Sequence, residues 1–384
     1  MRIAFFGLQQ AFDYNHIGGS ESITRRLAKQ LTENCDVETA DYILFHAPYS
    51  EKKTIIPQIR VRYFKTYAEA ASALLTGYDH VISFHLPRRE RILYMRFRYL
   101  HKDHLKFHAF WTMFNPSPIK RLLGMYDIRL VPLNGALFVI SPRLYKMARR
   151  WVPRTFLMLP PVPDDWFLRA SDKPIQKPMR VTFIGRIDPG KGAADVVELF
   201  ARLAGDTRFV CRFYGYTYEK KRVSKAEEKI YFRLKALPKR IFVESNYVKY
   251  SPEVDIAVRA TLAETDILLL PYRNVSSTAD MPLVFMEGMA SLCALILPSS
   301  AADLPQVYGS SQFYIRGEDW VESMAEILAS AGDFLEQERQ RSEARNGQLN
   351  FGATASAQAF KRALLGQEPP RVGAWPENLL TFRG

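Results

Sequence analysis

The sequence lacks the features that mark secreted, membrane-spanning or disulfide-stapled proteins. Its three cysteines, Cys35, Cys211 and Cys293, are widely spaced and set in apolar sequence, which favours buried thiols in a reducing cytoplasm over disulfides or a metal site. No stretch without a charged residue is longer than 15 residues, which is too few to cross a bilayer. The N-terminal MRIAFFGL has none of the regions of a secretion signal. We expect a cytoplasmic protein, at most peripheral at the inner face of the cell membrane.

Acidic residues are scarce in the first part of the chain. Residues 1–160 hold 24 Lys and Arg against 12 Asp and Glu, whereas 161–384 hold 29 against 28. All seven histidines also lie in the first part. This asymmetry predicts that the first half faces an anionic partner. Nothing else in the sequence is typical of a nucleic-acid-binding module, so nucleic acid is not expected.

Apolar runs of strand length alternate with helical patterns along the whole chain. Strands are expected at 2–7, 42–46, 80–85, 106–111, 136–141, 155–159, 181–185, 209–215, 241–245, 266–271, 294–298 and 312–315. Helices are expected at 20–33, 67–76, 88–102, 143–151, 191–204, 223–237, 284–291, 318–348 and 354–364. Continuous apolar strands between helices predict parallel sheets covered on both faces. The predicted fold class is α/β, with two doubly wound, Rossmann-like domains facing each other across a cleft.

A proline-rich stretch separates the two alternations. Residues 160–178 contain five prolines, which is typical of a connection between domains. We predict an N-terminal domain at 1–162, a linker at 163–179 and a C-terminal domain at 180–364. The remaining segment, 365–384, is expected to rejoin the N-terminal domain.

The segment VTFIGRIDPGKG (181–192) ends a buried strand at a glycine and then brings in two cations. Arg186 lies just past the strand, and Lys191 lies in the first turn of the next helix. Ligands of doubly wound sheets bind at the carboxyl ends of strands, where helix N-termini present N–H groups. Two cations among glycines suit a diphosphate. Taken alone, a tight turn with solvated cations explains the segment equally well.

A second segment breaks this tie. SSTADMPLVFMEGMASLCALILP (276–298) places Glu287 in a short helix before a buried strand. Together with GRIDPGKG, it resembles the retaining glycosyltransferases of family 4 (glycosyl transferases group 1), which have the two-domain architecture called GT-B. HIGGSESITRRLAKQL (16–31) and LAETDILLLP (262–271) are similar to two further segments of that family. The resemblance covers nearly the whole chain, in the right order.

The resemblance implies a nucleotide-diphosphate sugar as donor, without another cofactor. Arg186 and Lys191 would grip the diphosphate and stabilise its charge as it leaves, which makes them catalytic. Glu287 would accept hydrogen bonds from the ribose hydroxyls. The alternative is that Glu287 is an exposed helix residue without a binding role. Further donor contacts would come from Gly18, Gly19, Gly185, Leu283 and Val284, although the glycine pair also suits a plain turn before a helix.

The sequence departs from the family pattern at one acidic position. The family's first glutamate falls at Ala279 here, and Asp280 follows it with a side chain one methylene shorter. Asp280 is the candidate for that catalytic role. No Asp-x-Asp triplet stands in a plausible loop, so no metal is expected and the two cations would replace it.

Histidines end two of the first-half strands. His108, in KFHAFW, stands where the family has a strand followed by a histidine, and His85, in SFHLP, ends the preceding strand. An imidazole at either place can hydrogen-bond an acceptor sugar. His108 is therefore a catalytic and acceptor-binding candidate, and His85 an acceptor-binding one. The alternative for both is a structural role at the strand terminus.

The segment PRRERILYMRFRYLHKDHLK (87–106) threads seven Lys and Arg residues among aromatic and aliphatic ones. Such a helix suits an anionic membrane interface or a lipid-linked acceptor. An ordinary helix with its apolar side in the core explains it equally well.

The leading functional hypothesis is therefore a retaining hexosyltransferase. It would move a sugar from a nucleotide-diphosphate sugar to a lipid-linked, lipopolysaccharide or polysaccharide acceptor. The alternatives are another GT-B enzyme on a nucleotide sugar, such as an epimerase or a phosphorylase, and a non-catalytic nucleotide-sugar-binding protein.

Overall fold

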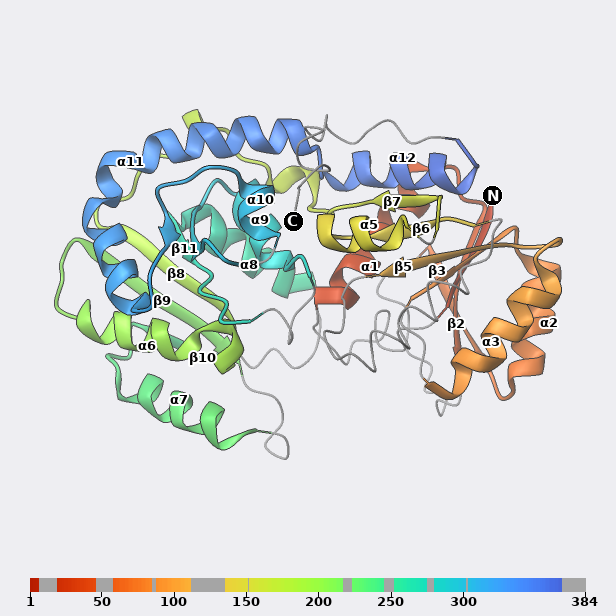
Figure 1. Cartoon of the computed structure of the whole chain (residues 1–384), viewed down its shortest axis with the longest axis horizontal. Helices are drawn as coiled ribbons and strands as arrows, with labels where there is room; N and C mark the ends of the chain where they lie inside the picture. Colours follow the sequence, from red (N-terminus) through yellow and green to blue (C-terminus); the bar gives the residue numbers. More distant parts are fainter. Residues whose placement is uncertain are drawn as a thin grey trace. The chain divides into compact units, whose positions relative to one another are not determined.

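The computed structural model contains two compact units, which are described separately below. It describes residues 1–6, 19–45, 58–84, 88–111, 135–150, 152–216, 223–244, 252–274, 280–301 and 303–367. Unit 1 comprises Met1–Pro163, Ala279–Met281 and Asn350–Gly384, and unit 2 comprises Asp164–Thr278 and Pro282–Leu349. Most of the helices and strands of both units are labelled in Figure 1.

In its described part, unit 1 is built on a seven-stranded parallel sheet. The strand order is β3-β2-β1-β4-β5-β6-β7, which is a doubly wound order that reverses direction between β1 and β4. The strands are β1 Arg2–Phe6, β2 Thr39–Phe45, β3 Ile59–Phe64, β4 His80–Ser83, β5 Lys106–Trp111, β6 Leu137–Val139 and β7 Thr155–Leu157. The helices are α1 Gly19–Asn34, α2 Tyr67–Gly77, α3 Arg88–His101, α5 Pro142–Ala148 and α12 Ala353–Leu364.

Unit 2 repeats this design with a six-stranded parallel sheet in its described part. Its order is β10-β9-β8-β11-β12-β13. The strands are β8 Met179–Arg186, β9 Phe209–Tyr216, β10 Phe242–Glu244, β11 Ile267–Leu269, β12 Ala294–Pro298 and β13 Tyr314–Ile315. The helices are α6 Ala193–Arg202, α7 Lys225–Ala236, α8 Pro252–Glu264, α9 Leu283–Ala290, α10 Leu304–Tyr308 and α11 Trp320–Leu349. The predicted α/β class with two Rossmann-like units is confirmed.

Strand β3 was not predicted, because charged residues interrupt its apolar pattern. Ile59 is buried, while Arg60 and Arg62 lie on the outer strand of the sheet and pair with Asp41 of β2, at 2.9 and 3.9 Å. The Tyr78 hydroxyl also donates to Asp41, at 2.5 Å, and burial raises the pKa of Tyr78 to about 12. A buried carboxylate therefore anchors an edge strand that the sequence presents as polar.

The last helix, α12, packs on unit 1 and not on the C-terminal domain to which we assigned it. The ring centroid of Phe360 lies 4.0 Å from that of Phe138 on β6 and 6.4 Å from that of Phe110 on β5. Arg154 Nη2 also donates to the carbonyl of Ala363, at 2.9 Å. Because apolar faces of similar composition cover both sheets, the sequence alone does not show which sheet α12 joins.

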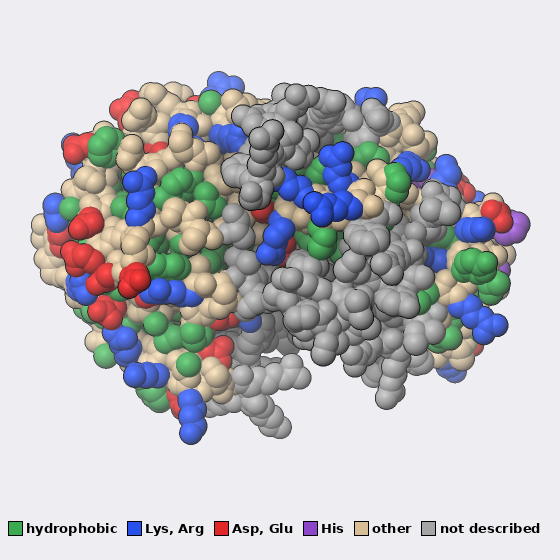
Figure 2. Space-filling model, viewed as in Figure 1, with side chains coloured by type: hydrophobic (Ala, Val, Ile, Leu, Met, Phe, Trp, Pro, Cys, Tyr) green, Lys and Arg blue, Asp and Glu red, His purple; other side chains and the backbone are tan. Residues whose placement is uncertain are grey.

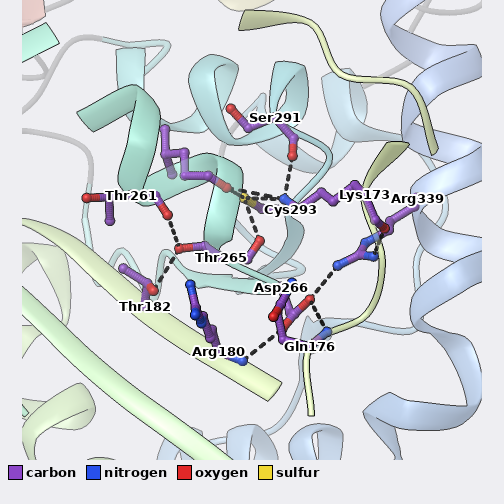
Figure 3. A network of polar contacts seen from close by, with 11 residues as sticks. Lys173, Gln176, Arg180, Thr182, Thr261, Thr265, Asp266, Ser291, Cys293 and Arg339 are labelled. Carbon is purple, nitrogen blue, oxygen red and sulfur yellow. Dashed lines mark hydrogen bonds and ion pairs between the residues drawn. The ribbon is translucent and has the colours of Figure 1, made fainter. Parts of the chain in front are cut away.

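The segment predicted to be a linker, 163–179, belongs almost entirely to unit 2 and packs against it. Lys173 is buried, and its ammonium donates to the carbonyl oxygens of Ser291, at 2.5 Å, and Leu262, at 3.2 Å. Arg339 of α11 donates to the carbonyl of Lys173 and, at 2.5 Å, to Oδ1 of Asp266. Figure 3 shows this network, which fastens 173–180 to the amino edge of the sheet.

Candidate functional site

The turn after β8 holds the two predicted cations around one carboxylate. Arg186 Nη2 lies 3.0 Å from Oδ2 of Asp188. Oδ1 of the same carboxylate accepts the N–H of Gly190 at 2.7 Å and so caps a short 3-10 turn, Pro189–Lys191. Asp188 was not predicted as a site residue, although an aspartate before Pro-Gly is a known turn signal. The carboxylate orients Arg186 and shapes the turn at once.

Lys191 lies beside the glycine that ends the apolar part of β8. A Cβ atom on Gly185 would stand 3.6 Å from both Cδ and Nζ of Lys191, which is an ordinary contact distance and places the lysine side chain directly against this glycine. Burial, and to a smaller extent the charge of Arg186, lowers the pKa of Lys191 to about 8. Two cations therefore lie near one carboxylate, and the net positive charge would favour an added anion.

Gly192 joins this turn to α6 in a backbone conformation that favours glycine. Its φ is +71°, and a Cβ atom there would lie 2.0 Å from the carbonyl oxygen of Pro271. The backbone N–H of Asn274 donates to the carbonyl of Gly190, at 3.1 Å. The segment after β11 therefore packs against the turn. Gly192 is also the N-cap residue of α6, so no side chain caps that helix.

Arg273 holds that closing segment in place. Its guanidinium donates two hydrogen bonds to Asp195 in the first turn of α6, at 2.9 and 2.6 Å, and stacks 3.8 Å from the ring centroid of Trp320. This bidentate pair fixes the geometry of the site from outside it.

The predicted ribose-binding residues lie in α9, at the same edge of the sheet. Strands β8 and β11 are parallel neighbours, so the segments that follow them leave the sheet at a common edge. Leu283 and Val284 are partly exposed at the N-terminus of α9, and Glu287 is buried one turn later with 5% exposure. Gly288 allows α9 to approach the sheet, because a Cβ there would stand 2.6 Å from Leu268.

The two glycines predicted to approach the donor from the N-terminal domain are only partly described. Gly18 lies outside the described residues. Gly19 begins α1, is exposed, and would have no atom within 4 Å of an added Cβ. Space alone therefore does not require glycine at position 19.

His108 occupies a different place from the one the sequence suggested. It is the third residue of β5, not the last, and is 1% exposed. Its Nδ1 accepts the N–H of Ala136 at 3.1 Å, so the proton of the neutral ring is on Nε2, which lies 3.2 Å from Nδ1 of His80. Burial lowers the pKa of both rings, that of His80 to about 4. His108 is a neutral core residue in this structure, with no surface to offer an acceptor; His85 lies outside the described residues.

Asp280 is bound within unit 1. Its Oδ2 accepts two hydrogen bonds from Arg143, at 3.2 and 2.8 Å, and one from Ser141, at 3.3 Å. Ser141 caps α5. Asp280 is 3% exposed, and Ala279, where the family's glutamate would stand, lies outside the described residues. The carboxylate is therefore engaged with an arginine, which a side chain poised for catalysis would have to leave.

No cluster of three or more His, Cys, Asp or Glu side chains that could hold a metal ion occurs in the part of the chain that the structure describes. No helix within those same residues is long and apolar enough to cross a membrane.

Comparison with known proteins places the fold. No protein-family model matches the sequence, and no curated protein matches it. Among solved structures, a glycosyltransferase from Rickettsia africae ESF-5 superimposes with a TM-score of 0.63 at 12% identity, over 95% of this chain and 98% of that one. AviGT4, a glycosyltransferase involved in avilamycin A biosynthesis, gives 0.53 at 16%, over 95% and 98%.

A third match is an alpha-glucosyltransferase in complex with UDP and a 13-mer DNA containing an HMU base. It gives a TM-score of 0.58 at 12% identity, over 91% of this chain and 95% of that one. Identities this low establish a shared fold and no more. The chain thus has the α/β fold of the GT-B glycosyltransferases.

Proposed function

We propose that the protein is a retaining glycosyltransferase that takes a hexose from a nucleotide-diphosphate sugar, such as a UDP-sugar. The observation that carries this proposal is the turn after β8. There Arg186 pairs with Asp188, and the charges of both residues act on Lys191, beside the N-terminus of α6. Such a turn suits a group with two negative charges. The matching alpha-glucosyltransferase was solved with UDP, which supports a nucleoside diphosphate as the ligand.

The chemistry follows from the charge that forms on the leaving group. Breaking the bond between the sugar and the diphosphate leaves negative charge on the phosphate oxygen, and preorganised cations stabilise that charge in the transition state. Arg186 and Lys191 would supply this stabilisation, the role that a divalent metal has in other glycosyltransferases. Glu287, with Leu283 and Val284 at the start of α9, would bind the ribose. The step as proposed assigns no role to His108 or Asp280, which are held by internal partners in this structure.

The first test separates an enzyme from a binding protein. A thermal-shift screen of nucleotide sugars should identify a donor, and mixing that donor with a lipid or polysaccharide extract should release nucleoside diphosphate. Glu287→Gln should weaken binding of the nucleotide while the fold is kept, as checked by circular dichroism. A donor that binds but yields no diphosphate with any extract would favour the non-catalytic alternative. Conversion of the donor to its epimer would favour an epimerase, and formation of a sugar 1-phosphate from added phosphate would favour a phosphorylase.

We further propose that the acceptor is anionic or lipid-linked and that α3 touches the membrane surface. Tyr94 and Phe97 face the core of unit 1, but Leu93, Tyr99 and Leu100 are 46, 75 and 57% exposed. Arg96 and Lys102 are exposed beside them. A second group of cations surrounds α5, at Arg143, Lys146, Arg149 and Arg150, where Figure 2 shows Lys and Arg side chains gathered.

Vesicle binding tests this second part. The full-length protein should sediment with anionic vesicles at low salt, and binding should fall steeply as salt rises, because screening acts over about 8 Å at physiological ionic strength. Tyr99→Ser/Leu100→Ser should reduce sedimentation, as should replacement of Arg88, Arg89 and Arg91 by serine. The matched control is Ile256→Ser on α8, where the side chain is 66% exposed. Wild-type protein that ignores anionic vesicles would point to a soluble anionic acceptor.

A further inference from the structure

The sheet of unit 2 departs from the rule that both faces of a doubly wound sheet are apolar. One face of β8 and β9 carries Val181, Phe183, Cys211 and Phe213, which belong to the core. The other face carries Arg180 and Thr182 on β8 and Arg212 and Tyr214 on β9, together with the apolar Ile184 and Val210. Parallel strands buried on both faces normally show continuous apolar runs, so polar residues on alternate positions indicate a face with another task.

That polar face lines a cavity of about 480 Å³. Its walls come from the segment before β8, from β8 and β9, and from the end of α8. The Thr182 and Thr265 hydroxyls join across it, 2.8 Å apart, so β8 is fastened to the segment after α8 (Figure 3). The cavity is bounded by strands and a helix, and its volume is large enough for a small metabolite.

The charges around the cavity are mainly positive. Its lining includes three cations, Lys177, Arg180 and Arg212, and one carboxylate, Glu264. Arg180 pairs with Glu264, and Arg212 donates to the carbonyl of Arg240. Thr182 is the neighbour of Arg212 on the adjacent strand, and Arg180 is the neighbour of Val210, so the two guanidinium groups stand diagonally on one face, at a distance both side chains can span.

We propose that this cavity binds a small phosphate monoester, separately from the turn after β8. Arg180 and Arg212 would hold the phosphate oxygens, since guanidinium groups suit phosphate geometry. Lys177 adds a cation at the rim, and Tyr214 offers a ring and a hydroxyl to the organic part. The site lies along the amino half of β8, whereas Arg186 ends that strand at the opposite edge, so one strand serves two anion sites.

The test uses the full-length protein and two probes, inorganic phosphate and glucose 1-phosphate, in calorimetric titration. Arg212→Gln and Lys177→Gln should each weaken binding of glucose 1-phosphate, Arg212→Gln by about 10- to 150-fold, as for loss of a charge-assisted hydrogen bond. The matched control is Arg208→Gln, which removes an arginine just before β9 that pairs with Asp206. It should change the affinity less than twofold. A preference for glucose 1-phosphate over phosphate identifies a monoester site; equal binding of both would reduce the ligand to the phosphate ion.

A second pair of variants distinguishes this site from the donor turn. Arg186→Ala and Lys191→Ala should leave the affinity for glucose 1-phosphate unchanged, whether or not the protein proves to be a glycosyltransferase. Circular dichroism would confirm that each variant is folded. The proposal is overturned if wild-type protein binds neither probe at millimolar concentration, if Arg212→Gln binds like wild type, or if only the Arg186 and Lys191 variants lose binding.

Discussion

The two edges of the unit 2 sheet use the same kinds of charged side chain in opposite ways. At the amino edge, Arg339 and Asp266 form an ion pair at 2.5 Å with side chains only 2% and 0% exposed. At the carboxyl edge, Arg186 and Asp188 pair at 3.0 Å and keep 15% and 13% of their side chains exposed. The first pair is enclosed by the fold, whereas the second keeps part of its surface accessible.

The difference also lies in how the neighbouring lysine is used. The ammonium group of Lys173 donates to two backbone carbonyls and lies 3.6 Å from Cys293 Sγ, so its hydrogen-bond partners all lie inside the unit. Lys191 stands beside a second cation instead, with the pKa lowered to about 8. Charge type alone does not distinguish the two environments; burial does, since Lys173 is buried and Lys191 is partly exposed.

The largest expected effect is a loss of stability when the buried ion pair at the amino edge of the unit 2 sheet is broken. Asp266→Ala leaves the Arg339 guanidinium buried without its carboxylate, and removing one partner of a buried pair costs about 3–5 kcal/mol. Urea denaturation followed by tryptophan fluorescence, to which Trp166 and Trp320 of unit 2 contribute, should show this loss. The affinity of the folded protein for nucleoside diphosphate should not change. A loss below about 1 kcal/mol would mean that the network is dispensable.

At the open edge the effect should appear in binding and not in stability. Arg186→Gln and Lys191→Ala should each weaken nucleoside diphosphate by about 1.5–3 kcal/mol, or ~10–150-fold, because each removes a charge-assisted contact. The same variants should barely affect binding of the nucleoside, which lacks the diphosphate. Equal losses for both ligands in calorimetric titration would contradict the assignment of the turn.

The smallest expected effect is the change with pH in the affinity for nucleoside diphosphate. An anion binds the protonated form of Lys191, whose pKa of about 8 lies below the ordinary value. Affinity for nucleoside diphosphate should therefore be level near pH 7 and fall as pH rises through 8, by at most about tenfold per pH unit. Lys191→Arg keeps its charge throughout this range and should give a flat profile. A wild-type profile as flat as that of the variant would exclude titration of Lys191.

Much of the fold could be predicted, because continuous apolar strands separated by helical patterns have few other arrangements. The failures have physical causes. In β3, Arg60 and Arg62 interrupt the apolar pattern that would predict a strand. Their charges are balanced by Asp41, which lies 19 positions from Arg60 in the sequence. In α8, apolar and polar residues alternate without a clear face, and the helix was not predicted. The motif around Arg186 and Lys191 could be predicted because its residues are adjacent in sequence.

By itself, the sequence determined the alternation of strands and helices, the glycine-rich turn and the basic character of the first half. These depend on local chemistry: side-chain size, backbone freedom and charge. Only the tertiary structure decided that α12 joins unit 1, that His108 is enclosed between His80 and the N–H of Ala136, and that Asp280 is engaged with Arg143. Each of these depends on which distant segments meet, because burial and pairing are properties of the packed chain and not of any one segment.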